Sequence, residues 1–308
     1  MKIFLTGSSG MVGKNILEGG TCLNNEWFCP SHSELDLLNY AHVEAALHNF
    51  QPDLIIHAAG VVGGIQANIK EPVRFFYDNL EIGKNVVWAA KKLGIKKILN
   101  LSSSCMYPKD KDTMLVEEDI LTGSIELTNE GYALAKIVVA KLCAFISNEF
   151  KDLHYKTLIP CNLYGRWDKF DLSHGHMIPA VIKKIHEAVK NNSNTVEIWG
   201  DGTARREFMY AADLADFILF AADNFEKLPN MINVGLGHDF SILEYYKQIA
   251  KVVGFKGDFS FNLTKPIGMK RKLIDVSKSN RLGWTAKTSL KDGLEKTYNF
   301  FLSENASN

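Results

Sequence analysis

The chain of 308 residues lacks features that would place it in a specialised class of protein. It has no excess of charge, because 35 lysine and arginine residues balance 35 aspartate and glutamate residues, so nothing suggests a nucleic-acid or membrane-surface partner. It has no apolar run that approaches the roughly 18 residues needed to span a bilayer. With 46% hydrophobic and 23% charged residues, the composition is typical of a globular protein of one or two domains.

Cysteine is scarce and follows no recognisable pattern. The five cysteines are an odd number and show neither a C-x-x-C pair nor the cysteine and histidine spacing of a metal site. We therefore expect reduced thiols and no bound metal, which is typical of a cytoplasmic protein. Residues 1–6 run directly into a glycine turn and lack the cleavage pattern of a secretory signal, which also favours a cytoplasmic location.

Strands and helices are expected to alternate over the first half of the chain. An apolar strand over 2–6 leads through a glycine turn into a helix, and the same rhythm then repeats. This pattern predicts an α/β fold with a Rossmann-type, doubly wound parallel sheet. We expect a dinucleotide-binding domain over 1–165, to which 211–235 return, and a smaller, discontinuous α/β substrate lobe made of 166–210 and 236–308.

The first strand ends in a turn with the spacing G-x-x-G-x-x-G. Gly7, Gly10 and Gly13 would allow a tight turn, the close approach of a pyrophosphate, and close packing of the next helix on the strand. The N-terminus of that helix would present free N–H groups and the positive end of its dipole to the phosphates. Since the motif lies between a strand and a helix, it predicts a dinucleotide site.

The loop after the second predicted strand indicates which dinucleotide is bound. It offers no early carboxylate to accept a hydrogen bond from the ribose of NAD. Ser9, Ser31 and His32 instead offer donors for a 2′-phosphate, so the sequence favours NADP(H). A third short strand is expected over 35–38, where Asp36 would cap the adenine pocket. The expected cofactor contacts are Gly7, Ser9, Gly10, Met11, Val12, Gly13, Ser31, His32, Asp36, Leu37, Ala58 and Ala59.

A buried strand over 98–101 leads into a serine-rich turn, and a helix that carries Tyr132 and Lys136 follows. Positions i and i+4 share a helix face, so both side chains can point into one cleft. We expect the ammonium group to lower the pKa of the phenol from about 10 and so to make it a better proton donor. A hydroxyl of Ser103 or Ser104 could bind the same reacting oxygen. Such a set suits proton exchange with a carbonyl during hydride transfer; a surface tyrosine and a solvated lysine are the alternative.

Helix 131–150 is apolar nearly all round, and in a monomer one of its faces would stay exposed. We therefore expect a C2 homodimer through helices 72–93 and 131–150, the alternative being a helix that its own domain covers on both sides. Within helix 72–93, Asn79 is either a brace for a loop of the cofactor site or an exposed amide. Residues 61–67 contain two glycines and are expected to form a flexible loop on the substrate side.

Five motifs occur in a characteristic order along the chain. They are the glycine turn, the serine-rich turn at 102–108, the Y-x-x-x-K pair, Asn-Leu-Tyr-Gly at 162–165 and Arg-Glu-Phe at 206–208. Together they resemble the extended short-chain dehydrogenase/reductases, and more closely their GDP-L-fucose synthase subfamily of GDP-4-keto-6-deoxymannose 3,5-epimerase/4-reductases. The likeness extends over nearly the whole chain, to further motifs at 271–273 and 282–284.

The resemblance implies roles for residues of the expected cleft. Ser103, Tyr132 and Lys136 would form the reductase triad, and Lys136 would also hold the nicotinamide ribose. Cys105 and His176 would form the acid–base pair of epimerisation, and His176 would also touch the cofactor. A thiolate and an imidazole are a workable pair near neutral pH, because each titrates close to it.

The resemblance also implies contacts to the substrate. Arg206 would bind the diphosphate through bidentate hydrogen bonds, against the alternative of a salt bridge with Glu207. Asn162 would touch the nucleotide sugar, and Lys272 or Arg271 would lie near the GDP end. The full set of expected substrate contacts is Ser104, Asn162, Trp199, Arg206, Arg271 and Lys272.

Three departures from the subfamily leave the sugar open. Ser9 stands in place of an arginine, Arg166 and Trp167 in place of a proline–histidine pair, and Gly175, which would leave room for a longer sugar, in place of a serine. The expected activity is NADPH-dependent 4-reduction of a GDP-linked 4-keto-6-deoxy sugar, a hexose or a heptose, with or without 3,5-epimerisation. The alternatives are a reductase-only GDP-4-keto-6-deoxyheptose enzyme that has lost epimerisation, an NAD-retaining nucleotide-sugar epimerase, and a non-catalytic dinucleotide sensor.

Overall fold

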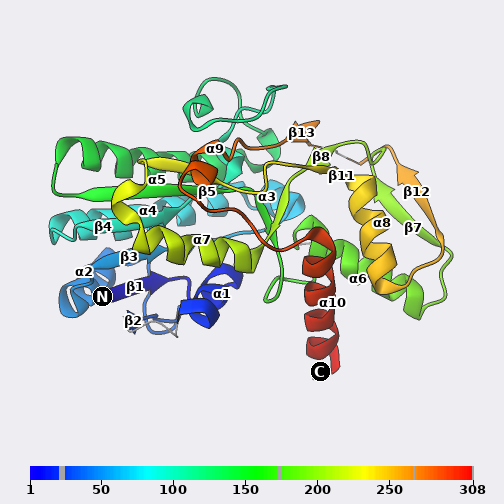
Figure 1. Ribbon diagram of the computed structural model, residues 1–308, viewed down its shortest axis with the longest axis horizontal. Coiled ribbons are helices and arrows are strands. Elements are labelled where there is room, and N and C mark those ends of the chain that lie inside the picture. Colours follow the sequence, from blue (N-terminus) through cyan, green and yellow to red (C-terminus); the bar gives the residue numbers. More distant parts are fainter. Residues whose placement is uncertain (21–24, 172–174, 266–267, 307–308) are drawn as a thin grey trace.

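The computed structural model describes residues 1–20, 25–171, 175–265 and 268–306 as two lobes (Figure 1). The larger lobe is built on a six-stranded sheet with the order β10-β5-β4-β3-β1-β2, in which every pairing is parallel. Its strands are β1 (Lys2–Thr6), β2 (Glu26–Phe28), β3 (Leu54–His57), β4 (Lys97–Leu101), β5 (His154–Pro160) and β10 (Met231–Val234). The predicted Rossmann-type parallel sheet is confirmed.

Helices cover both faces of this sheet. One face is covered by α1 (Met11–Gly20) and α7 (Ala211–Asp223), and the other by α2 (Tyr40–Phe50), α4 (Pro72–Lys92) and α5 (Glu130–Glu149). Successive strand side chains point to opposite faces, so Ile3 and Leu5 pack into one core and Phe4 into the other. All three are almost fully buried, as expected for a parallel sheet with helices on both sides.

The order of the strands places a crevice at one point of the sheet. β1 pairs with β2 on one side and with β3 on the other, so the chain reverses its direction of progress between β1 and β3. At such a topological switch point, the loops that leave the two strands diverge and open a ligand crevice at the carboxyl end of the sheet. The loops concerned are the glycine turn that begins at Gly7 and the segment 58–60.

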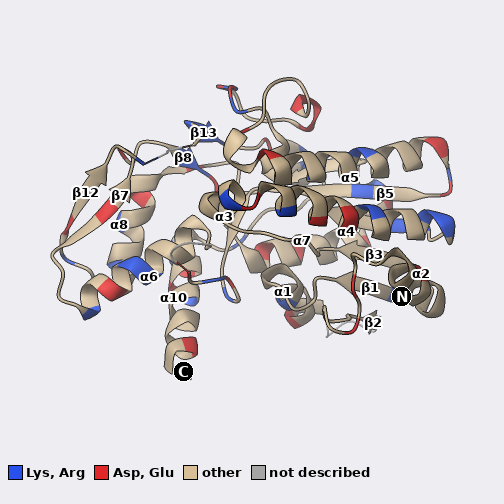
Figure 2. Ribbon diagram, turned by 180° about the vertical axis from the view of Figure 1, so that it is seen from behind, with Lys and Arg blue, Asp and Glu red and all other residues tan. Residues whose placement is uncertain are grey.

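The smaller lobe has a core of its own between α6 (Met177–Lys190), α8 (Ile242–Val253) and α10 (Leu290–Ala306). Its short strands form two sheets, β12-β7 and β11-β8-β13. Their bounds are β7 (Thr195–Trp199), β8 (Arg205–Arg206), β11 (Phe240–Ser241), β12 (Asp258–Asn262) and β13 (Arg271–Lys272). Acidic and basic residues are interspersed on both lobes (Figure 2).

The chain passes between the lobes more than once. β6 (Asn162–Tyr164) leaves the large sheet and pairs with β9 (Phe208–Tyr210), which leads back into α7. Near the end of the chain, Ile274 and Trp284 on either side of α9 (Ser277–Arg281) are buried in the core of the larger lobe. The predicted division into domains stays a prediction, and this last segment shows that residues after 236 contribute to both lobes. No helix among the described residues is long and apolar enough to cross a membrane.

Two local predictions are wrong. Residues 35–38 form turns rather than a strand, because the Asp36 carboxylate accepts a hydrogen bond from the Leu38 N–H at 3.0 Å and closes the backbone on itself. Residues 61–67 are not all loop, because α3 (Ile65–Lys70) begins within them. The Asn68 side chain donates to the carbonyl oxygens of Gly63 and Gly64 at 2.9 and 3.0 Å and so holds the start of this helix.

Candidate active site

A cavity of about 1150 Å³ begins at the switch point of the sheet and continues between the two lobes. It is larger than the roughly 300–1,000 Å³ of an ordinary ligand pocket, so it offers room for more than one nucleotide-sized group. All twelve expected cofactor contacts line it, as do Ser103, Cys105, Tyr132, Lys136 and His176. Four of the six expected substrate contacts also line it, namely Asn162, Trp199, Arg206 and Lys272.

The glycine turn forms a cradle that side chains would fill. Gly7 has a φ of +73°, and a Cβ atom there would lie 2.7 Å from the backbone nitrogen of Ala59. A Cβ atom at Gly13 would lie 2.2 Å from the carbonyl oxygen of Gly7. The turn therefore packs backbone on backbone, and its residues and the start of α1 line the cavity. This geometry fits a pyrophosphate.

The two strands at the switch point are fastened by a buried hydrogen-bond chain. The Thr6 hydroxyl accepts from the N–H of Ala59 at 3.2 Å and forms a 2.8 Å hydrogen bond with Nδ1 of His57. Burial, with the charge of Lys136 adding to it, lowers the pKa of His57 to about 3. His57 is therefore neutral, and its Nδ1 and the Thr6 hydroxyl share this hydrogen bond. The chain fixes the distance between the two loops that flank the crevice.

The acidic side chains of the loop after β2 form hydrogen bonds within that loop. The Glu34 carboxylate accepts from both the N–H and the hydroxyl of Ser31 at 2.7 Å, and these hydrogen bonds lower the pKa of Glu34. Asp36 accepts from the backbone of Leu38. Ser9, Ser31 and His32 face the cavity. Neither carboxylate is thus committed to a ribose hydroxyl, which agrees with the prediction of NADP(H).

Asn79 braces the loop on the other side of the crevice. It is almost fully buried in α4, and its Oδ1 accepts from the N–H of Val61 at 3.0 Å. Its Nδ2 donates to the carbonyl oxygens of Val61 at 3.0 Å and Phe75 at 2.7 Å. A Cβ atom at Gly60 would lie 2.8 Å from this Oδ1 and 3.4 Å from Nζ of Lys136. Of the two hypotheses for Asn79, the brace is confirmed.

Tyr132 and Lys136 face the cavity from the first turns of α5. Nζ of Lys136 donates to the carbonyl oxygen of Leu101 at 3.1 Å and lies 5.8 Å from the centre of the Tyr132 ring. Burial lowers the pKa of Lys136 to about 8. Burial raises the pKa of Tyr132, the charge of Cys105 raises it further, and a hydrogen bond with Ser103 lowers it. The expected lowering of the phenol pKa is therefore wrong, because desolvation of the buried phenol dominates.

Cys105 lies in a short 3₁₀ turn (Ser104–Met106) at the end of β4. Its N–H donates to the hydroxyl of Ser103 at 3.2 Å. Its sulfur accepts from Nδ2 of Asn129 at 3.1 Å and from Nζ of Lys272 at 3.6 Å. Lys272, expected near the nucleotide end, thus lies beside the thiol, and Asn129 is a site residue that the sequence did not indicate. Ser104 is buried and does not line the cavity.

His176 precedes α6 and is oriented by a second unpredicted residue, Asp168. Its Nδ1 lies 3.7 Å from Oδ1 of Asp168, whose side chain is almost fully buried. Burial acts to lower the pKa of His176, but the hydrogen bond with Asp168 and the charge of that carboxylate outweigh it, so the pKa is raised. A Cβ atom at Gly175 would lie 2.5 Å from the carbonyl oxygen of Asp171 and 2.6 Å from that of Lys169. A side chain at this position would therefore meet its own loop; Gly175 also lines the cavity, and the expectation that it makes room for a longer sugar stays a prediction.

Basic residues line the cavity in the smaller lobe. Burial lowers the pKa of Arg206, whose Nη1 donates to the carbonyl oxygen of Arg205 at 2.8 Å. Glu207 is bound to the backbone N–H groups of two loops, so it is not the salt-bridge partner that the alternative proposed. Lys184 also lines the cavity, although the sequence analysis did not predict it. It stands eight residues after His176, and positions at i, i+4 and i+8 share one face of a helix, so this spacing could have indicated that both side chains face the cavity.

Arg271 does not line the cavity. Its Nε donates to Oδ2 of Asp239 at 2.5 Å, and Oδ1 of the same carboxylate binds Arg205 at 2.7 Å. Side chains alternate along a strand, so in β13 Arg271 points outward while Lys272 points inward.

Two other expected substrate contacts, Trp199 and Asn162, line the cavity. Trp199 is 37% exposed, and Nδ2 of Asn162 donates to the carbonyl oxygen of Glu207 at 2.8 Å. Within the described residues there is no group of three histidine, cysteine, aspartate or glutamate side chains that could hold a metal ion.

Comparisons with known proteins agree with this geometry. A model of the NAD dependent epimerase/dehydratase family matches residues 3–235. The chain is 57% identical to the GDP-L-colitose synthase of Yersinia pseudotuberculosis over 99% of both proteins. It is 46% identical to the GDP-L-fucose synthase of Azorhizobium caulinodans over 99% of this chain and 97% of that protein. Among solved structures, the GDP-mannoheptose C4 reductase from Campylobacter jejuni with NADP bound is similar, with a TM-score of 0.88, 29% identity and 98% of each chain covered.

Proposed function

The chain belongs to the NAD dependent epimerase/dehydratase family, and on this premise we propose that it is an NADP-dependent 4-reductase of a GDP-linked 4-keto-6-deoxy sugar that also epimerises C3 and C5. The observation that carries the proposal is the convergence of two sets of side chains in one cavity. Ser103, Tyr132 and Lys136 form a set for reduction, and Cys105 and His176 form a set for epimerisation. Both sets lie beyond the glycine cradle, where the reactive end of a dinucleotide would be.

The cofactor would lie along the switch point of the sheet. The backbone around Gly7 and Gly13 would hold the pyrophosphate, and Ser9 and His32 would donate to the 2′-phosphate of NADP, beside Ser31. When bound, NADPH supplies the hydride. The NADP-bound relative from Campylobacter supports this choice of cofactor.

Reduction needs a proton at the 4-oxygen of the sugar. Tyr132 would donate it, and Ser103 would hold the same oxygen by a hydrogen bond. The raised pKa of Tyr132 suits this role, because the phenol stays protonated until an alkoxide develops next to it. With a pKa of about 8, Lys136 would hold the nicotinamide ribose and could pass a proton towards Tyr132 near neutral pH.

Epimerisation needs one group that removes a proton beside the 4-ketone and another that returns it from the opposite face. Cys105 and His176 both line the cavity and have suitable chemistry. The raised pKa of His176 favours the imidazolium, which is the form that returns a proton. Tyr132 and Ser103 would stabilise the enolate between the two transfers with the same hydrogen bonds that serve reduction.

We assign a sugar of the fucose or colitose kind rather than a heptose. The GDP-L-colitose and GDP-L-fucose synthases are 57% and 46% identical to this chain, against 29% for the heptose reductase. Gly175, on which the argument for a longer sugar rests, lines the cavity but is also required by the close packing of its own loop. The nucleotide would extend from the reactive centre towards Arg206 and Trp199.

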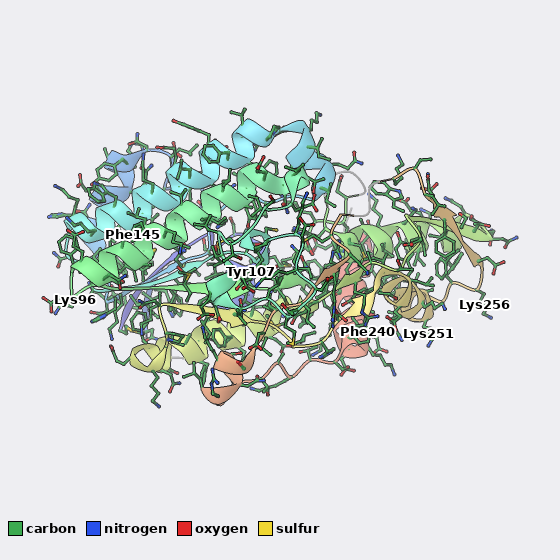
Figure 3. The ribbon with its side chains drawn as sticks, turned by 90° about the horizontal axis from the view of Figure 1, so that it is seen from above. Lys96, Tyr107, Phe145, Phe240, Lys251 and Lys256 are labelled. Carbon is green, nitrogen blue, oxygen red and sulfur yellow. The ribbon has the colours of Figure 1, made fainter. Side chains whose placement is uncertain are left out.

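The assembly would be a C2 homodimer through α4 and α5. Phe145 and Val138 on α5 are 64% and 46% exposed, so the larger lobe leaves this face of the helix uncovered (Figure 3). Tyr77 and Trp88 are exposed on the adjacent α4. Covering this apolar face with a second copy is the simplest way to bury it. Analytical ultracentrifugation of the wild type and of Phe145→Glu tests this, and a monomeric wild type would contradict it.

The experiment for the reaction follows the keto sugar and NADPH together in deuterated water. We expect loss of NADPH absorbance and incorporation of deuterium at C3 and C5, and co-migration of the product with GDP-L-fucose. Tyr132→Phe should abolish reduction, whereas Cys105→Ser should spare reduction of a substrate that is already epimerised. An enzyme that leaves NADPH unchanged and is purified with tightly bound NAD would instead be a cofactor-retaining epimerase.

A further inference from the structure

The sulfur of Cys105 is surrounded by hydrogen-bond donors. Nδ2 of Asn129 donates to it at 3.1 Å, and Nζ of Lys272 donates to it at 3.6 Å. A neutral thiol is a weak acceptor, and an ammonium group gains little from it. A thiolate is an anion, for which an amide N–H and a cation are the appropriate partners. The arrangement therefore fits the charged form of the side chain.

The burial of Lys272 supports the same conclusion. Only 9% of this residue is exposed, and an ammonium group removed from water is costly unless an anion lies beside it. Lys272 reaches the sulfur from β13, whose pairing with β8 sets it next to Arg206 in the sheet. A thiolate at Cys105 would supply a negative charge between these basic residues and would offset part of their desolvation.

The two donors come from distant parts of the chain. Asn129 ends the 3₁₀ turn Leu127–Asn129, immediately before α5, and Lys272 belongs to the smaller lobe. Cys105 lies at the end of β4 in the larger lobe. The pocket for the sulfur is thus assembled from three elements, and it depends on the relative position of the two lobes.

We propose that Lys272 and Asn129 are positioning residues that hold Cys105 as a thiolate, ready to act as the base of epimerisation. This deepens the proposed function and rests on it. The thiolate takes the proton from the carbon beside the ketone and becomes a thiol, while the electron pair of the broken C–H bond moves to the ketone oxygen. The imidazolium of His176 then returns a proton to the opposite face, and both groups recover their starting forms by exchange with water.

The proposal separates the two halves of the reaction. Reduction takes its proton from Tyr132, so it does not need a thiolate. Removing the charge of Lys272 should therefore slow deuterium incorporation at C3 and C5 and spare reduction of a substrate that is already epimerised. A residue that only bound the GDP group would affect both reactions alike, mainly through KM.

The first test needs no sugar. Alkylation of Cys105 by iodoacetamide, a neutral reagent, is followed by peptide mass spectrometry in the wild type and in Lys272→Met. We expect the rate to fall about tenfold or more, because a nearby cation favours the reactive thiolate. Cys29 serves as the internal reference: burial raises its pKa to about 11, and it lies outside the cavity.

Two further variants make the result specific. Lys270→Met removes the same charge from an exposed neighbour and should leave the alkylation rate unchanged. Lys272→Arg keeps the charge and should restore most of the rate, which excludes misfolding as the cause. Asn129→Ala removes the second donor and should lower the rate by a smaller factor. The thiolate absorbance of Cys105 is measured in the wild type as the difference from Cys105→Ser. We expect this absorbance to be lower in Lys272→Met and Asn129→Ala, in parallel with the alkylation rate.

The outcomes distinguish this proposal from the function on which it rests. Unchanged alkylation in both Lys272→Met and Asn129→Ala would overturn the proposal even if the enzyme epimerises the sugar. Equal loss of reduction and of deuterium incorporation in Lys272→Met would overturn it as well, in favour of a substrate-binding role. A fall in alkylation in a protein that turns over no keto sugar would support the thiolate pocket and defeat the proposed function.

Discussion

Gly7→Ala is the change that most directly tests whether the crevice at the switch point holds the cofactor. Gly7 ends β1 with a φ of +73°, a conformation that residues with a side chain rarely adopt. The added Cβ would lie 2.7 Å from the nitrogen of Ala59 and 2.8 Å from its Cα. The glycine turn and the loop after β3 lie on opposite sides of the proposed pyrophosphate site. The substitution therefore pushes the first segment against the second.

The expected loss of unfolding free energy in Gly7→Ala has two contributions. The left-handed conformation costs an alanine about 1–2 kcal/mol. Three backbone atoms within 2.8 Å add an overpacking cost of about 1–3 kcal/mol, since backbone cannot rotate away as a side chain can. Gly94 isolates the first part, because its φ is +68° and an added Cβ would have no heavy atom within 4 Å. The difference between the two variants is therefore the cost of closing the crevice.

The assay is urea unfolding combined with NADPH titration, for the wild type, Gly7→Ala and Gly94→Ala. We expect Gly94→Ala to lose about 1–2 kcal/mol of unfolding free energy and to bind NADPH as the wild type does. Gly7→Ala should lose more and should bind NADPH at least about tenfold more weakly, which corresponds to about 1.4 kcal/mol. Equal stability losses together with unchanged NADPH binding would refute the placement of the cofactor.

Three further predictions concern single side chains. Asp168→Asn should lower the pKa of His176, so that the imidazolium is lost at lower pH and the alkaline limb of the epimerisation rate moves to lower pH, while reduction of an epimerised substrate keeps its profile. Asn79→Ala should cost about 2 kcal/mol in urea unfolding, because it leaves the backbone of Val61 without its partners, and should weaken NADPH binding. Lys136→Met should abolish reduction yet raise the unfolding free energy at pH 7 by about 2–3 kcal/mol. Burial lowers the pKa of Lys136 from 10.5 to about 8. The free-energy cost of burying its charge in the folded state is therefore fully present below pH 8 and decreases as the pH rises towards 10.5.

The parts of the fold that the sequence predicted correctly depend on short spacings. The glycine turn between β1 and α1 is fixed by three glycines within seven residues. Tyr132 and Lys136 are one helical turn apart, so any helix at that place brings them to one face. The same holds for the parallel sheet, because strand–helix alternation leaves few other arrangements. In the first two cases the relevant interaction lies within a single element or between consecutive ones.

The predictions that failed concern features that depend on the surrounding fold rather than on sequence spacing. Residues 35–37 are apolar, polar and apolar like the start of a strand, but the Asp36 side chain accepts from the Leu38 N–H and turns the backbone before a strand can pair. Asn129 and Asp168 have no local signature, and each becomes a site residue only because the fold brings it to Cys105 or His176. The direction of the Tyr132 pKa shift failed for a related reason. A charge four residues away can be read from the sequence, whereas desolvation depends on every element that covers the side chain.

The two proposed proton chemistries share one structural support. Ser103 and Cys105 flank the buried Ser104 in a single 3₁₀ turn, and the N–H of Cys105 donates to the Ser103 hydroxyl. A movement of this turn would displace the hydroxyl that serves reduction and the thiol that serves epimerisation together. The two activities can therefore be tuned separately only through partners that reach one of them alone. Lys272 for the thiol and Asp168 for the imidazole are such partners, and both lie in segments that enter the cavity after β5.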